Sequence, residues 1–190
     1  MKKILAIATD GFEEIELAAP LDLLHRAGAK ITLATVCANE NLLIKGRSDF
    51  SVKADSALET LAPSPAEFEK LADDFDALFL PGGPGTWKLL EDGRAPKIAT
   101  AFAKKGKLVA AICAAPLLLK AAGLLDGKRV SAHSCAWDEI PAARNCPPVE
   151  SDGNILTSRG PGTAFDFGLA FVEKLFGSAT AEKICVETMK

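Results

Sequence analysis

Short apolar runs alternate with longer amphipathic stretches along this chain. The first unit has an apolar run at residues 4–9, an amphipathic stretch at 13–26 closed by Gly28, and a second run at 30–36. Apolar runs of this length predict strands, and a repeat near 3.6 residues that ends at a glycine predicts a helix. The chain is therefore expected to open as a β-α-β unit.

The same alternation continues to the end of the chain. Residues 42–55 are irregular and predict a short hairpin at most. Further strands are expected at 76–80, 108–112, 128–131 and 155–158, and further helices at 66–72, 116–123, 163–176 and 179–188. Asp166 is placed to complete a capping box in the 163–176 helix. Strands that alternate with helices predict an α/β fold, a doubly wound, mainly parallel sheet with helices on both faces.

Composition narrows the class of protein. The chain has 190 residues, 48% of them hydrophobic, and contains no linker-like tract, so we expect one domain spanning residues 1–190. A net charge of -3 and a pI near 5.5 argue against specific nucleic-acid binding. No apolar stretch is long enough to span a bilayer, so no membrane partner is expected.

The cysteines indicate a redox environment. There are five of them, at positions 37, 113, 135, 146 and 185, with neither a paired framework nor metal-ligand spacing. An odd count without pairing is typical of a reducing compartment, and we expect a cytoplasmic protein. With only two histidines, no metal site is predicted.

Cys113 lies where the apolar run 108–112 gives way to a helix that contains Pro116 in its first turn. Ligands of open α/β sheets collect at the carboxyl ends of strands, and the free amides of a helix start favour thiolate over thiol. This position suits a nucleophile. A small buried core cysteine is the alternative interpretation.

Two glycine-rich segments, 81–86 and 158–163, each follow a strand and lead into a helix through an expected threonine cap, Thr86 and Thr163. Neither matches the Walker pattern or the dinucleotide pattern GxGxxG, so phosphate binding is not favoured. Such glycines can let backbone N–H groups approach a reacting oxygen. Alternatively, the segments are only tight turns.

The first helix carries three acidic residues near its start. Glu13 and Glu14 are expected to complement the helix dipole and face water. Glu16 is followed by apolar residues, and its loop faces the same sheet edge as Cys113. Burial beside a thiolate would raise its pKa, so Glu16 is expected to keep its proton, donate it to the sulfur in a hydrogen bond and later shuttle it.

Four motifs in order resemble the ThiJ/PfpI superfamily, specifically its DJ-one branch: GFEEIE at 11–16, LPGG at 80–83, AAICAAP at 110–116 and LTSRGPGT at 156–163. The resemblance spans nearly the whole chain. It implies a flavodoxin-like core related to class I glutamine amidotransferases, and a homodimer. It also implies that Cys113 is the nucleophile and Glu16 its carboxyl partner.

The same resemblance implies further site residues. Backbone amides near Gly82, Gly83 and Ala114 would surround the substrate oxygen. His133 falls where many members place a histidine near the cysteine, although a purely structural role for it stays open. Arg47 resembles an arginine contributed to the pocket edge across the dimer.

Departures from related families limit the activity. Ala114 stands where the protease-like branch has a histidine after its cysteine, so a protease would lack its base. Glutamine amidotransferases need an acid two residues after the histidine, and Cys135 occupies that position after His133. Neither proteolysis nor amide transfer is therefore expected.

The resemblance implies a cofactor-independent, glutathione-independent glyoxalase or deglycase. Its substrates would be small reactive carbonyls, namely methylglyoxal, glyoxal or their early glycation adducts, and its products hydroxy acids. The alternative is an oxidative-stress redox sensor or chaperone that acts through oxidation of Cys113 without turnover. A flavin-binding protein fits the expected fold but not the loops. A stripe on the first helix, Ile15, Ala18, Ala19 and Leu23, would serve either a dimer interface or the monomer core.

Overall fold

The computed structural model describes residues 1–37 and 40–190. Within them, seven strands form one sheet in the order β5-β2-β1-β6-β7-β9-β8, and β3 and β4 form a separate two-stranded ladder. The strands are β1 (Lys3–Ala8), β2 (Lys30–Thr35), β3 (Leu43–Lys45), β4 (Ser51–Lys53), β5 (Ser56–Ala57), β6 (Ala77–Leu80), β7 (Leu108–Ile112), β8 (Val149–Asp152) and β9 (Ile155–Ser158).

Helices connect most of these strands. They are α1 (Glu14–Arg26), α2 (Leu58–Leu61), α3 (Ala66–Asp74), α4 (Gly85–Asp92), α5 (Arg94–Lys104), α6 (Pro116–Ala121), α7 (Ala164–Phe176) and α8 (Ser178–Glu187), with short 3-10 turns η1 (Ser134–Ala136), η2 (Pro141–Asn145) and η3 (Pro161–Thr163). None of the helices in the described part of the chain is long and apolar enough to cross a membrane.

The sheet is mainly parallel. The neighbours from β5 through β9 all pair in parallel, and only β8 runs antiparallel, against β9. Parallel strands of this kind are buried on both faces, and all five residues of β7 are buried as the unbroken apolar run predicts. The doubly wound, mainly parallel flavodoxin-like fold expected from the sequence is confirmed.

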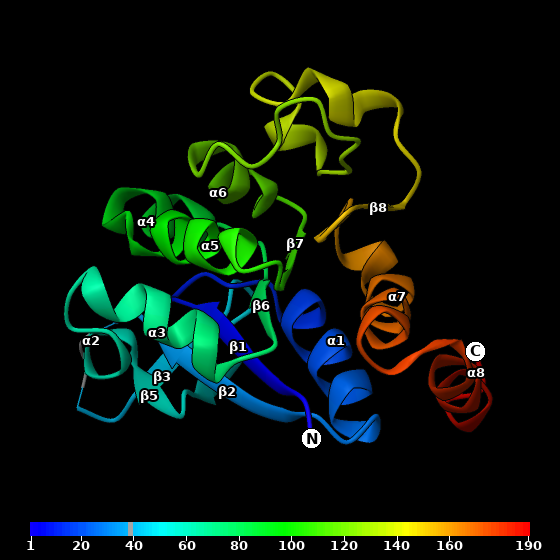
Figure 1. The fold of residues 1–190 in the computed structure, drawn as a ribbon, viewed down its shortest axis with the longest axis horizontal. Coiled ribbons are helices and arrows are strands. Elements are labelled where there is room, and N and C mark those ends of the chain that lie inside the picture. Colours follow the sequence, from blue (N-terminus) through cyan, green and yellow to red (C-terminus); the bar gives the residue numbers. More distant parts are fainter. Residues whose placement is uncertain (38–39) are drawn as a thin grey trace.

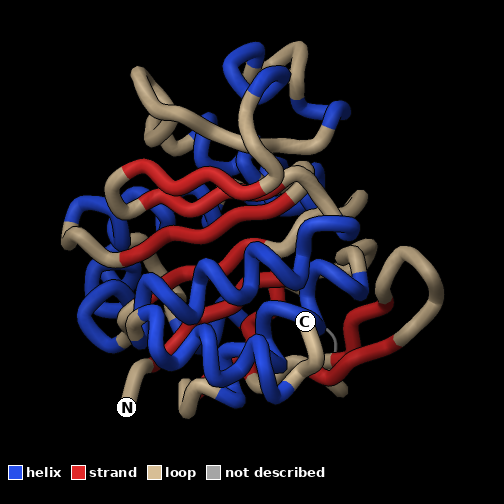
Figure 2. Tube along the Cα trace, turned by 90° about the vertical axis from the view of Figure 1, so that its right-hand side faces the viewer, coloured by secondary structure: helices blue, strands red, loops and turns tan. Residues whose placement is uncertain are grey.

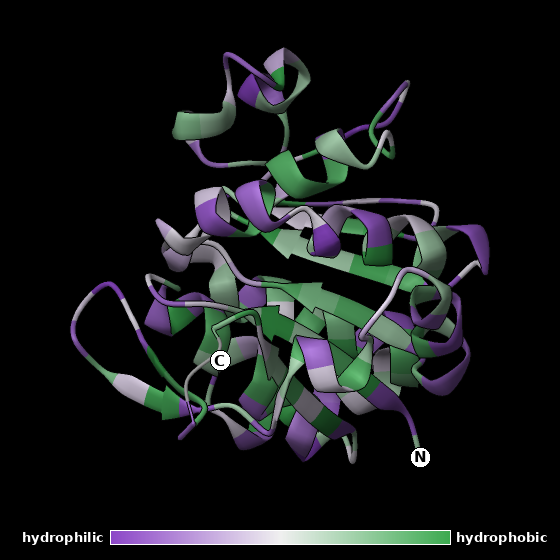
Figure 3. Cartoon of the chain, turned by 90° about the vertical axis from the view of Figure 1, so that its left-hand side faces the viewer, coloured by the Kyte–Doolittle hydropathy of each residue, from purple (hydrophilic) through white to green (hydrophobic). Residues whose placement is uncertain are grey.

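Helices cover both faces of the sheet. One face carries α1, α7 and α8, and the other carries α3, α4, α5 and α6 (Figure 1). Successive residues of β7 point to opposite faces, so that Ala110 and Ile112 join the first core and Val109 and Ala111 the second. Figure 3 shows the hydrophobic strands between the layers, and in Figure 2 the β3–β4 hairpin projects from the side of the body.

An aromatic cluster fixes α7 against the middle of the sheet. The rings of Phe79, Phe167 and Phe171 lie with centroids 5.9 to 6.1 Å apart at tilted or edge-on angles. Such pairs contribute about 0.5–1.5 kcal/mol beyond their buried area. Because Phe79 belongs to β6, the cluster also sets where the loop before α7 can lie.

The strand expected at 128–131 is wrong. The N–H of Arg129 donates to Asp152 Oδ2 at 3.1 Å, and the N–H of Ser131 donates to Thr157 Oγ1 at 2.9 Å. Side-chain acceptors from β8 and β9 thus replace the carbonyl partners that a strand needs. The hairpin expected within 42–55 does form, as β3 and β4.

The helix starts also differ from expectation. Thr86 lies inside α4, whose N-cap is Pro84, and Thr163 precedes α7 without a side-chain cap bond. The Thr163 hydroxyl instead bonds to Ser158 Oγ at 2.6 Å and lies 3.2 Å from the Gly160 nitrogen, which tightens the loop itself. Asp166 forms no capping box, because it pairs with Lys190 at 2.9 Å.

Candidate active site

The central parallel strands end at one edge of the sheet, and the loops that follow them enclose a cavity of about 200 Å³. Together with two further segments, these loops bring six separate parts of the sequence to the cavity. The cavity is lined by Glu16, Arg47, Gly83, Pro84, Trp87, Cys113, Ala114, His133, Cys135 and Pro161.

Cys113 directly follows β7 and adopts a left-handed backbone conformation, with φ 67°. This conformation costs a residue with a side chain of order 1–3 kcal/mol and persists only where neighbours enforce it. Here the N–H of Cys113 donates to the Ser158 carbonyl at 2.9 Å, and its carbonyl accepts from the His133 N–H at 2.8 Å. These two bonds hold the corner, and the thiol, 8% exposed, reaches the cavity.

Glu16 reaches the same place from the first turn of α1, and its side chain is fully buried. Its Oε2 accepts a hydrogen bond from the Gly82 N–H at 3.0 Å. Its Oε1 has no partner of regular geometry among the described residues. A Cβ built on Gly160 would lie 3.7 Å from this Oε1 and 3.9 Å from Cys113 Sγ, so both atoms border the same wall.

Glu13 and Glu14 do not simply face water, and that expectation is wrong. Glu13 is buried as the N-cap of α1, where its Oε2 accepts from the Glu16 N–H at 2.8 Å. Glu14 Oε1 accepts from the Ser48 N–H at 2.7 Å, which ties α1 to the β3–β4 hairpin. Both acids therefore position the helix that carries Glu16.

Burial raises the pKa of Glu16 to about 7. The hydrogen bond with the Cys113 thiol opposes this shift, the charge of Glu13 adds to it, and the Gly82 amide and the Arg47 charge oppose it more weakly. A carboxyl group with such a pKa exists in both protonation states near neutral pH. It can therefore accept and return a proton there.

Burial also raises the pKa of Cys113, and the charge and hydrogen bond of Glu16 raise it further. A backbone hydrogen bond from Gly83 lowers it, without reversing the direction. The expectation that the helix start favours the thiolate is thus wrong on balance. The helix α6 begins only at Pro116, whereas the ionised Glu16 carboxylate is a direct neighbour. Ionisation of either group therefore favours the proton on the other.

Two positions of the first glycine-rich loop, Gly82 and Gly83, have no room for a side chain. A Cβ at Gly82 would lie 2.6 Å from Glu16 Oε2 and 2.7 Å from Cys113 Cβ. Gly83 has φ 96°, and a Cβ there would lie 2.5 Å from the Gly11 carbonyl oxygen. The loop therefore lies directly against Glu16 and Cys113, with the Gly83 amide directed at the sulfur, and a role of its N–H groups at a reacting oxygen stays a prediction.

His133 and Arg47 form the outer part of the cavity. His133 is exposed, and its Nδ1 accepts from the Cys135 N–H at 3.2 Å. Arg47 follows β3, and its N–H donates to the Phe12 carbonyl at 2.9 Å. This bond brings Arg47 to the cavity of its own chain, so the expectation that it comes from across a dimer is corrected.

Four lining residues were not among the predicted site residues: Pro84 and Pro161, which lie within the two glycine-rich segments, and Trp87 and Cys135. Trp87, 49% exposed, lies in the first turn of α4 directly after the loop 81–84, which is the signal that could have identified it. Cys135 follows His133 by two positions, on η1. Among the described residues, no three His, Cys, Asp or Glu side chains are grouped so that they could hold a metal ion.

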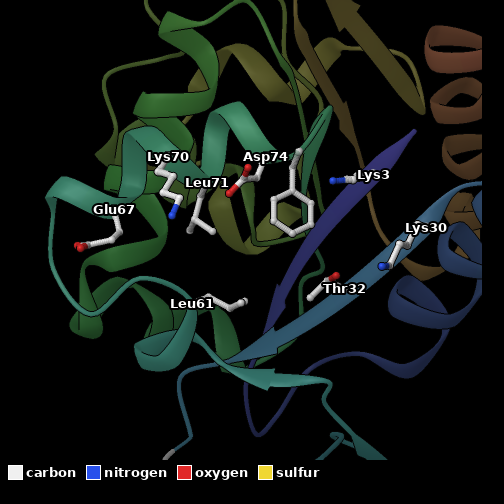
Figure 4. Close-up of a pocket in the computed structure, with 9 residues that line it drawn as sticks. Lys3, Lys30, Thr32, Leu61, Glu67, Lys70, Leu71 and Asp74 are labelled. Atoms are coloured by element: carbon white, nitrogen blue, oxygen red, sulfur yellow. The ribbon is translucent and has the colours of Figure 1, made fainter. Parts of the chain in front are cut away.

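A larger cavity, about 430 Å³, lies at the opposite, amino-terminal edge of the sheet. In Figure 4 side chains of α3 face those of β1 and β2 across it. Its lining residues are Lys3, Lys30, Thr32, Leu61, Glu67, Lys70, Leu71, Asp74 and Phe75, and of its charged members Glu67 is half-buried and the others are exposed. None of these carries a thiol or a buried ionisable group, so this cavity lacks the chemistry of the first.

This chain is similar to known proteins over nearly its whole length. The chain is 33% identical to a Parkinson disease protein 7 homolog of Danio rerio, over 96% of this chain and 94% of that one. It is 32% identical to deglycase PfpI of Pyrococcus furiosus, over 91% and 99% of the two chains. The solved structure of oxidized DJ-1 from Toxoplasma gondii matches with a TM-score of 0.85 at 30% identity, covering 100% and 98%.

The family model agrees with these individual matches. It covers residues 2–174, which include all four motifs and every residue that lines the carboxyl-edge cavity. The chain belongs to the DJ-1/PfpI family.

Proposed function

We propose that the protein is a glyoxalase or deglycase that converts methylglyoxal, glyoxal or their early glycation adducts into hydroxy acids without glutathione or another cofactor. The observation that carries this proposal is the buried pair of Cys113 and Glu16, in which the carboxyl group has a pKa of about 7 beside the thiol. Relatives named deglycase support an enzymatic activity of this kind.

The reaction begins with attack of the Cys113 sulfur on the aldehyde carbon. Because the pKa of Cys113 is raised, the thiol must give up its proton as it attacks, and the Glu16 carboxylate is the adjacent acceptor. Glu16 then passes this proton to the former aldehyde oxygen, so the product is a hemithioacetal and Glu16 is again a carboxylate. Its oxygen would be stabilised by N–H groups near Gly83 and Ala114, which border the cavity.

A proton then moves between the two former carbonyl carbons. Glu16 removes it from the carbon bonded to sulfur and returns it to the neighbouring carbon, and His133 assists from the outer side. The intermediate becomes a thioester of the hydroxy acid. Addition of water releases the acid and restores the thiol, so that methylglyoxal plus water gives lactate.

The first experiment measures methylglyoxal consumption and lactate formation, without added thiol or metal. The unmodified protein is compared with Cys113→Ser, and Cys185→Ser is the matched control because Cys185 lies on α8, outside the cavity. Lactate from the unmodified protein and from the control, but not from Cys113→Ser, is the expected result. Equal lactate from all three proteins would refute the nucleophilic role, and lactate from none would refute the activity.

A redox sensor or chaperone without turnover is the second candidate. It is favoured by the Cys113 thiol, which reaches the cavity beside a carboxyl group able to bond an oxidised sulfur. Mass spectrometry after mild peroxide treatment tests it. Selective oxidation at Cys113 is required, and uniform oxidation of all five thiols would exclude it.

We also propose a homodimer formed through an apolar surface on α1 and the β3–β4 hairpin. Ile15 and Phe50 are 55% and 71% exposed there, beside an apolar cavity of about 330 Å³. Of the predicted stripe, Leu23 is instead fully buried in the chain's own core. Light scattering should show a monomer for Phe50→Asp and a dimer for the control Val186→Asp, which alters an exposed apolar residue of α8.

We further propose a cytoplasmic location. All five cysteines are free, as is typical of a protein in a reducing compartment.

A further inference from the structure

A second thiol shares the carboxyl-edge cavity with Cys113. Cys135 lies on η1 and borders the same space of about 200 Å³. Both cysteines are free, and Cys135 is the more exposed of the two. One cavity of this size therefore contains one thiol at its base and another at its mouth.

The backbone ties the two cysteines together. The His133 N–H donates to the Cys113 carbonyl at 2.8 Å, which places the segment that carries Cys135 directly against the corner after β7. Within this segment Ala136 is buried and its N–H bonds to the His133 carbonyl at 2.9 Å, whereas Ser134 and Cys135 are exposed. These backbone bonds lie on either side of Cys135, whose side chain is exposed beside the corner that carries Cys113.

Electrostatic interactions agree with this proximity. Ionisation of Cys135 raises the pKa of Cys113, after the larger effects of burial and Glu16. Burial raises the pKa of Cys135 itself, and the charge of Glu16 contributes. The charge of Glu16 thus acts on both thiols, and the two thiols border one cavity.

We propose that Cys135 is a resolving cysteine, which captures oxidised Cys113 as an intramolecular disulfide. A hydroperoxide is the oxidant. Its distal oxygen transfers to the Cys113 sulfur, the O–O bond breaks, the hydroperoxide is reduced to an alcohol or to water, and the thiol becomes a sulfenic acid. The Cys135 sulfur then attacks the Cys113 sulfur, the S–O bond breaks, and the hydroxyl leaves as water with the proton of the second thiol.

This reaction changes what oxidation does to the site. A sulfenic acid without a nearby thiol proceeds to sulfinic acid, which most proteins cannot reverse. A disulfide is returned to two thiols by an external dithiol. Cys135 would therefore make the loss of the Cys113 nucleophile reversible.

The other cysteines are not placed for this role. Cys37 shares a hydrogen bond with Thr9, Cys146 donates to the Ala142 carbonyl at 3.2 Å, and Cys185 donates to the Lys190 carbonyl at 3.3 Å. None of the three lines the cavity. Cys146→Ser and Cys185→Ser are thus matched controls for loss of a thiol.

The test treats the full chain with several molar equivalents of hydrogen peroxide, because a sulfinic acid requires two, and continues with alkylation and peptide mapping by mass spectrometry. The unmodified protein should lose two hydrogen atoms, give a cross-linked pair of peptides joining Cys113 to Cys135, and return to the starting mass with dithiothreitol. Cys135→Ser should give no cross-link and should instead retain oxygen atoms on Cys113 after dithiothreitol. Both control variants should behave as the unmodified protein does.

Two outcomes would overturn the proposal. One is stable oxygen addition at Cys113 of the unmodified protein with no cross-link; the other is a disulfide that joins any other pair, including one between two chains. The mapping of the unmodified protein is informative even if Cys135→Ser folds poorly. The readout is also independent of methylglyoxal turnover, so failure of the proposed enzymatic function and failure of this inference are distinguishable.

Discussion

The two ends of the sheet contain cavities of different character. The amino-terminal one is the larger, about 430 Å³ against about 200 Å³, and it contains several charged side chains. Those side chains are exposed or half-buried, whereas the carboxyl-terminal cavity contains a fully buried carboxyl group beside a thiol on a strained backbone. Burial of ionisable groups, rather than volume, therefore distinguishes a reaction site from a surface hollow.

Glu16 provides the sharpest test of this difference. Replacement of Glu16 by Ala removes the proton acceptor and donor, so kcat for methylglyoxal should fall by about 10²–10⁴-fold. His133→Ala should reduce kcat no more than that, because His133 is exposed at the cavity mouth. Steady-state lactate formation measures both variants, and a larger loss with His133→Ala would reverse the assigned roles.

The two cavities should also differ in how they affect the pH dependence of the free energy of unfolding. The folded protein raises the pKa of Glu16 from 4.5 to about 7, so between these values it binds a proton that the unfolded chain has released. This bound proton stabilises the folded state fully below about pH 4.5. As pH rises through about 7 that contribution is lost, and the free energy of unfolding falls by up to about 3 kcal/mol.

Urea unfolding at pH 5 and pH 8 checks this prediction. Glu16→Gln should remove the loss of stability toward high pH, because the amide does not titrate. Glu67→Gln, at the exposed amino-terminal cavity, should retain the full dependence of the unmodified protein. If Glu16→Gln kept that dependence, another group would have to be its source.

The close packing around Gly82 gives a third comparison. A methyl group there would overlap Glu16 and Cys113, so Gly82→Ala should destabilise the protein by about 1–3 kcal/mol and reduce turnover. Gly162→Ala is the control in the second glycine-rich loop, since nothing lies within 4 Å of its added Cβ. Denaturant unfolding measures both, and equal stability of the two variants would contradict the packing argument.

The smallest effect is expected at the amino-terminal cavity. Lys70 is exposed on α3, and Lys70→Ala should change the free energy of unfolding by no more than about 0.5 kcal/mol. The kcat for methylglyoxal should be unchanged. A loss of turnover comparable to that of Glu16→Ala would mean that the larger cavity takes part in the reaction.

The sequence predicted the residues whose placement depends on local pattern. Cys113 and Glu16 each follow from an apolar segment and its position at the carboxyl edge of the sheet. Glu13 was misjudged because its burial depends on a distant loop: its N–H donates to the Gly82 carbonyl at 3.0 Å, while its own carboxylate caps α1. Periodicity within one helix contains no information about such a partner.

Errors elsewhere have the same physical origin. A strand is predicted at 128–131, but Asp152 and Thr157, on strands more than twenty residues away along the chain, supply side-chain acceptors in place of a ladder. Cavity membership of Trp87 and Cys135 likewise depends on which loops meet in space. Most segment types follow from nearby residues, whereas contacts between segments, and a segment such as 128–131 that depends on them, do not.

The left-handed backbone at Cys113 has a consequence for how this chain can change. Glycine adopts that conformation without the penalty of about 1–2 kcal/mol that a side chain incurs. Selection for thermal stability alone would thus favour glycine at position 113, and that substitution would remove the thiol. Cysteine at position 113 therefore lowers the stability of the folded chain through one backbone angle, and in return it provides a reactive thiol at the cavity.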